Sequence, residues 1–156
     1  MTQLTDRFRR LRDAPAPSTD DLDALWADLP TVGVAEILGH WTGGDFATGH
    51  PISTVLSRAR WHGKWFDSAT DVTPIVCRGE DGTLQANERA AGGGAASLWN
   101  VEFRGEVTAT MVYDKVPVLD HFKQVDADTL VGIMNGKLES TYGITDLYYF
   151  WLEREK

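Results

Sequence analysis

The sequence predicts a mainly β protein, namely a single closed antiparallel barrel of about nine or ten strands with short helices near its amino-terminal part. From Trp61 onward, short apolar segments follow one another, and no helical pattern separates them. Turn signals lie between these segments, among them Asp81-Gly82, Arg104-Gly105-Glu106 and Asn135-Gly136. Strands joined by short turns pair antiparallel, and closure of such a sheet removes its exposed edges. We therefore expect a barrel.

Two helical segments are predicted before the first strand. Residues 5–12 are predicted to form a short helix, and a Pro-rich linker follows up to residue 17. Ser18 or Thr19 can cap a second helix that runs to Leu29. Its apolar residues share one face: Leu22, Leu25, Trp26 and Leu29. We interpret residues 1–17 as a tail or short helix with a linker, and residues 18–156 as one barrel domain.

The predicted strands cover residues 41–46, 61–66, 73–78, 84–88, 97–104, 107–113, 116–125, 129–135 and 147–153. A short helix is predicted between the first two, up to Arg60, because Pro51 suits a first helical position. The last strand is apolar at every position from Leu147 to Leu152, whereas a strand with one wet face should alternate. Either helices cover the outside of the barrel, or the barrel encloses an apolar space. We favour an internal pocket over a merely oversized core.

Composition narrows the classes of partner. The chain of 156 residues carries 15 Lys and Arg against 23 Asp and Glu, a net charge of −8. Such an acidic chain is a poor candidate for binding nucleic acid or an anionic membrane surface. Cys77 is the single cysteine, which favours a reducing compartment, and we find no apolar run long enough for a signal peptide or a membrane span. We expect a cytoplasmic protein without stable membrane insertion, and the sequence leaves a homodimer open.

The stretch from Gly39 to Gly43 has the form Gly-x-Trp-x-Gly, with Trp41 at its centre. Glycine allows a sharp turn or the close approach of another segment, so we expect the indole to fold inward and to close one end of the barrel. Its N–H should then reach a backbone carbonyl. The alternative is a core tryptophan beside a turn.

This motif resembles the signature of GXWXG-domain proteins. The segments 96–105, 111–114 and 120–122, with Pro117, are similar to the companion carboxy-terminal domain of unknown function. The resemblance places the first segment at about residues 20–80 and the companion at about 95–154. It implies a lipocalin-like or fatty-acid-binding-protein-like barrel that holds a lipid or another apolar ligand, and it brings no enzyme activity with it.

The main functional hypothesis is an intracellular carrier or sensor of a small apolar or amphiphilic ligand, such as a fatty acid or phospholipid. Such a site needs an apolar lining and one or two donors for a head group, and arginine can hold a carboxylate or phosphate bidentately. Arg78 and Arg104 end predicted strands, although salt bridges to acids such as Glu102 or Glu106 are the alternative for them. The predicted ligand-binding residues are Trp41, Arg78, Trp99, Arg104, Tyr113, His121, Lys123 and Tyr149.

Two further functions stay open. An enzyme could use His121 and Asp120 as acid and base, although neighbouring residues of a strand point to opposite faces. A haem-binding, nitrobindin-like barrel could use His121 as iron ligand, but Asp120 and Lys123 make that segment polar. The four histidines at positions 40, 50, 62 and 121 lack metal-ligand spacing. We therefore predict no catalytic residue, no metal and no cofactor.

Overall fold

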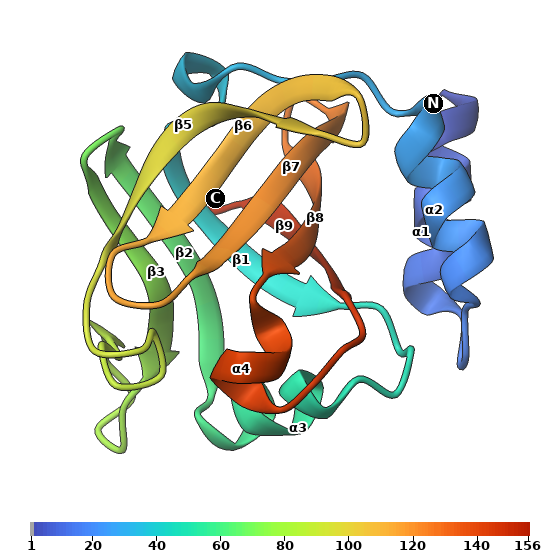
Figure 1. Ribbon diagram of the computed structural model, residues 1–156. Helices are drawn as coiled ribbons and strands as arrows, with labels where there is room; N and C mark the ends of the chain where they lie inside the picture. The colour runs from blue at the N-terminus through green and yellow to red at the C-terminus, as the bar shows by residue number, and fades with distance from the viewer. Residues whose placement is uncertain (1) are drawn as a thin grey trace.

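Eight antiparallel strands close a barrel in the computed structural model, which describes residues 2–156 (Figure 1). The sheet runs in the order β2-β1-β9-β8-β7-β6-β5-β3, and pairing of β2 with β3 closes it, while β4 extends β3. The predicted mainly β, lipocalin-like barrel is thereby confirmed. The strands are β1 (Gly39–Asp45), β2 (Trp61–Ser68), β3 (Asp71–Arg78), β4 (Leu84–Ala86), β5 (Ala96–Phe103), β6 (Glu106–Tyr113), β7 (Val118–Asp126), β8 (Thr129–Gly136) and β9 (Tyr148–Arg154).

Short helices accompany the barrel: α1 (Gln3–Asp13), α2 (Thr19–Asp28), the 3-10 turn η1 (Val34–Glu36), α3 (Pro51–Arg58) and α4 (Leu138–Tyr142). Ser18 caps α2, because its hydroxyl accepts the Asp21 N–H at 3.1 Å. Pro51 takes the first position of α3, as predicted. Met1, the first residue of the predicted tail, lies outside the described residues.

Helices α1 and α2 lie side by side along one side of the barrel (Figure 1). Their apolar faces pack on the outward residues of β8 and β9 in a cluster that includes Phe8, Trp26 and Tyr149. Phe150 and Leu152 of the same strand β9 belong to the cluster inside the barrel. The last strand is thus apolar on both faces because one face meets helices and the other meets the interior. None of the helices formed by residues 2–156 combines the length and apolar character that crossing a membrane requires.

Trp41 points into the barrel and is 1% exposed. Its indole N–H donates to the backbone carbonyl of Ile37 at 2.9 Å, so both the inward orientation and the predicted hydrogen bond are confirmed. Gly43 faces inward on the same strand, where a Cβ atom would lie 2.3 Å from the Trp61 ring. The second glycine of the motif therefore makes room for Trp61, which lines the interior space described below.

Strands β1 to β3 come from the first segment of the chain and β5 to β9 from the second. The two segments meet twice in the sheet, where β1 pairs with β9 and where β3 pairs with β5. The hairpin between β5 and β6 turns at Arg104 and Gly105, both with positive φ, as the predicted turn requires.

Candidate functional site

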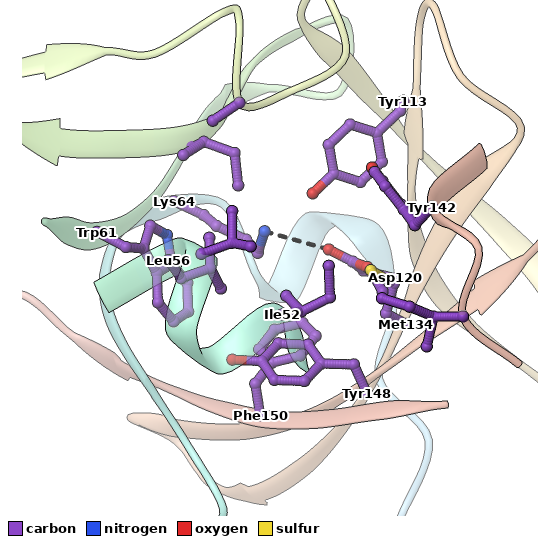
Figure 2. Close-up of a pocket in the computed structure, with 14 residues that line it drawn as sticks. Ile52, Leu56, Trp61, Lys64, Tyr113, Asp120, Met134, Tyr142, Tyr148 and Phe150 are labelled. Carbon is purple, nitrogen blue, oxygen red and sulfur yellow. Dashed lines mark ion pairs between the residues drawn. The ribbon is translucent and has the colours of Figure 1, made fainter. Parts of the chain in front are cut away.

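A cavity of about 180 Å³ lies between the inner face of the barrel and the helix α3 (Figure 2). Its wall is mainly apolar and aromatic, and includes Ile52 and Leu56 of α3 together with Trp61, Met134 and Phe150 of the strands. Ile52, Val55 and Leu56 face the cavity because they share one side of the helix. The barrel therefore has the internal apolar pocket that was expected, although the last strand is apolar on both faces because α1 and α2 cover its outer face.

A buried ion pair stands in this apolar wall. Lys64 Nζ lies 3.1 Å from Asp120 Oδ2, and the two side chains are 3% and 2% exposed (Figure 2). Lys64 faces inward because it pairs with Trp41 in the ladder between β1 and β2. Asp120 does so because it alternates along β7 with Val118 and Phe122, two residues of the inner core.

Burial acts on both members of the pair. It lowers the pKa of Lys64 and raises the pKa of Asp120, and in each case the charge of the partner opposes the shift. Lys64 gains two further sources of stabilisation. Its Nζ donates to the Pro74 carbonyl at 2.9 Å and lies 5.3 Å from the centre of the Phe150 ring.

Three tyrosines also line the cavity: Tyr113, Tyr142 and Tyr148. The Tyr113 hydroxyl points toward the ion pair (Figure 2), and burial together with the Asp120 carboxylate raises the pKa of Tyr113 well above its usual value. The Tyr148 hydroxyl is already engaged, because it donates to Asp45 Oδ2 at 2.8 Å. Burial and the Asp120 charge also raise the pKa of Tyr142, but Tyr113 is the tyrosine of the three whose hydroxyl interacts directly with the Asp120 carboxyl group.

Of the eight residues predicted to bind the ligand, Tyr113 lines the cavity. The structure gathers four others on the outer surface of the barrel, beneath α2: Arg104, His121, Lys123 and Tyr149. Lys123 Nζ donates to Glu106 Oε1 at 2.5 Å and to the Trp26 carbonyl of α2 at 3.0 Å. Arg104 and Tyr149 both donate to Asp23 Oδ1 of α2, at 2.9 and 2.6 Å.

Three residues of this outer group, Arg104, Lys123 and Tyr149, attach α2 to the barrel through their hydrogen bonds. The salt-bridge alternative for Arg104 holds, with Asp23 as the partner in place of Glu102 or Glu106. Arg104 and Tyr113, both predicted to bind the ligand, lie on different sides of the barrel wall: Tyr113 lines the cavity, whereas Arg104 bonds to Asp23 of α2.

His121 is buried on the same outer side and stacks on Phe103, with 4.0 Å between ring centres. Its Nδ1 is 2.9 Å from the Thr110 hydroxyl, which itself donates to the Thr108 carbonyl. Its Nε2 is 3.3 Å from the Asn135 amide nitrogen. Nδ1 is therefore the donor and Nε2 the acceptor of a neutral ring, and burial lowers the pKa of His121 to about 4.

This position of His121 bears on two of the hypotheses. Asp120 and His121 point to opposite faces of β7, as the alternation of a strand requires, so they form no acid–base pair. Among residues 2–156, no histidine lines the cavity, so the site does not fit haem ligation by histidine. The described part of the chain also places no group of three or more His, Cys, Asp or Glu where they could hold a metal ion.

The other three predicted residues also lie away from the cavity. Trp41 is in the core, on the barrel interior but outside the cavity wall. Arg78 donates to the Gly82 carbonyl at 2.6 Å in the turn that follows β3. Trp99 is 55% exposed, and its indole N–H donates to the Ser97 hydroxyl.

Sequence reasoning missed Lys64 as a site residue and gave Asp120 a role beside the wrong partner. The sequence around Lys64 does not show which face of β2 is buried. Lys64 and Phe66 are two residues apart and share the inward face, but Trp65 between them is also large and apolar, although it points outward. Register shifts between β2 and β3 interrupt the alternation further.

Comparisons with known proteins agree with this architecture. Residues 24–82 match the family model described as GXWXG protein, and residues 94–154 match a domain of unknown function, DUF4334. The chain is similar to a solved structure described as a protein from Thermomonospora curvata, with 34% identity and a TM-score of 0.87. That similarity covers 99% of this chain and 100% of the other. No curated protein matches.

Proposed function

The chain belongs to the GXWXG protein family with its companion domain, and we propose that it binds a small, mainly apolar ligand inside the barrel, as a carrier or sensor. The observation that carries this proposal is the cavity of about 180 Å³ with its apolar and aromatic wall. An engineered apolar cavity of about 150 Å³ is large enough to hold benzene. The volume therefore suits a molecule built on one ring.

A fatty acid or phospholipid is a larger guest. Pockets for drug-sized ligands have volumes of about 300–1,000 Å³, so the cavity would take only part of a long chain. Helix α3 would have to move outward to admit the rest. It contributes no fully buried residue, and Val55 is 54% exposed, which makes α3 the cover through which we expect a ligand to enter. We propose the cytoplasm as the location, since Cys77 has no cysteine partner.

The test is titration of the protein with toluene, followed by NMR of the methyl groups around the cavity. We expect saturable shifts in the wild type and none in Leu56→Trp, because the larger side chain fills the space beneath α3. Leu38→Trp is the matched control: the exchange is the same, Leu38 is 36% exposed, and it does not line the cavity. Equal binding of toluene by both variants would contradict the proposal, and so would a wild type that binds neither toluene nor the other small probes described below.

An enzyme acting on the bound molecule is the second candidate. The observation in its favour is that Lys64, Asp120 and Tyr113 face one cavity with shifted pKa values, a combination that is frequent at functional sites. Incubation of the protein with a small-molecule extract, followed by mass spectrometry of what it releases, separates the two. A compound released unchanged supports a carrier. A change of mass that Asp120→Asn abolishes supports an enzyme.

A further inference from the structure

One carboxylate oxygen in the cavity wall has no hydrogen-bond partner. Asp120 Oδ2 pairs with Lys64, whereas Oδ1 is buried and has no hydrogen-bond partner of good geometry among residues 2–156. The neighbouring Tyr113 hydroxyl interacts with the Asp120 carboxyl group and helps to hold down the pKa of Asp120, against the effect of burial. Lys64 Nζ pairs with Oδ2 and donates to the Pro74 carbonyl at 2.9 Å, and it makes no hydrogen bond to Oδ1. An ionised carboxylate only accepts hydrogen bonds, and burying one of its oxygens without a donor is unfavourable.

We propose that the cavity selects a neutral molecule of one ring that carries a hydroxyl group, an alcohol or a phenol, and that this hydroxyl donates to Asp120 Oδ1. This inference rests on the proposed function, since it names the class of ligand for the same cavity. The donor requirement follows from Oδ1, and the ring from the volume of about 180 Å³ and from aromatic walls such as Trp61 and Phe150.

The charge balance of the wall excludes an anionic ligand. Lys64 is the single cation among the described residues that line the cavity, and Asp120 already neutralises it at 3.1 Å. A carboxylate head group would meet the Asp120 charge in an apolar space, with no second cation to compensate it. A cationic ligand would in turn compete with Lys64 for the same carboxylate. A neutral donor satisfies Oδ1 and leaves the pair intact.

Phenol and toluene provide the direct comparison, because a hydroxyl replaces a methyl group of similar size. Dissociation constants for phenol, toluene and hexanoate are measured by NMR titration of the wild-type protein. We expect phenol to bind at least about tenfold more tightly than toluene, because a hydrogen bond to a charged group increases affinity by about that factor. Hexanoate, which brings a carboxylate, should bind more weakly than either.

Two variants assign the effect to Asp120. In the double variant Lys64→Met with Asp120→Leu, toluene should bind more tightly than phenol, because the phenol hydroxyl would then be buried without its acceptor. Tyr113→Phe keeps the ion pair and removes the neighbouring hydroxyl, and it should retain the preference for phenol. A preference lost in Tyr113→Phe would overturn the assignment to Oδ1.

The outcomes separate this inference from the proposed function. If toluene binds as tightly as phenol to the wild type, or hexanoate binds best, the inference is wrong while the ligand-binding cavity stands. If none of the three probes binds, the proposed function fails and the inference fails with it. The wild-type comparison decides these cases without any variant, so it does not depend on how well the double variant folds.

Discussion

Replacement of Trp41 by alanine tests whether the central residue of the motif holds the barrel interior together. The side chain is 1% exposed, its N–H bonds to the Ile37 carbonyl at 2.9 Å, and the Arg154 guanidinium lies 4.3 Å from its ring centre. Trp41→Ala removes all of these contacts and leaves a cavity. The expected loss of unfolding free energy is about 3–5 kcal/mol. That is a large share of the roughly 5–15 kcal/mol that stabilises a typical domain.

Urea unfolding followed by circular dichroism measures this loss. For a chain of this length we also expect the melting temperature to fall by roughly 6–20 °C. Trp99→Ala is the matched control, because Trp99 is 55% exposed and its removal should change the unfolding free energy by no more than about 0.5 kcal/mol. Equal stability of the two variants would refute the assignment of Trp41 to the core.

Two further predictions concern a close contact and a buried imidazole. Gly43→Ala would place a Cβ 2.3 Å from the Trp61 ring and should cost about 1–3 kcal/mol in a thermal melt, whereas at Gly33 the nearest atom would be 3.6 Å away and alanine should change little. His121 has a pKa of about 4 in the fold, below its value of about 6.5 in an unfolded chain, so the unfolded state takes up a proton first. The contribution of His121 to the unfolding free energy should therefore be fully present above about pH 6.5 and fall by up to about 3 kcal/mol toward pH 4. The variant His121→Gln should show a flatter dependence of the unfolding free energy on pH in this range. An unchanged slope would mean that the ring is not buried as a neutral group.

The local signals in the sequence predicted the fold well because they act over a few residues. Ser18 as a helix cap, Pro51 at a first helical turn and Arg104-Gly105 as a tight hairpin each depend on immediate neighbours. Helix α4 escaped prediction because its five residues, Leu138–Tyr142, are too few to show a periodicity.

The site was harder to predict because it depends on which face of a strand each residue takes. In the run from Asp120 to Lys123, polar residues fall on both faces, since Asp120 points inward while His121 and Lys123 point outward. The polar residues of the outer face resemble ligand-binding residues in the sequence. In the structure their partners come from α2, among them Asp23. Only the packing of α2 on the barrel distinguishes the two faces, and α2 is distant in the chain.

Burying the ion pair of Lys64 and Asp120 in an apolar interior is energetically unfavourable, so the pair is expected to serve a purpose other than stability. Replacing a buried pair by apolar residues of similar volume is often neutral or stabilises a protein by about 1–4 kcal/mol, whereas removing one partner leaves a buried charge and costs about 3–5 kcal/mol. We therefore expect the double variant Lys64→Met with Asp120→Leu to unfold at a urea concentration equal to or above that of the wild type, and Asp120→Leu alone to unfold well below it. A double variant as unstable as the single one would mean that Lys64 and Asp120, at 3.1 Å, hold the barrel together. If stability is retained instead, the pair contributes little to folding, and its place in the cavity wall is better explained by the ligand it recognises.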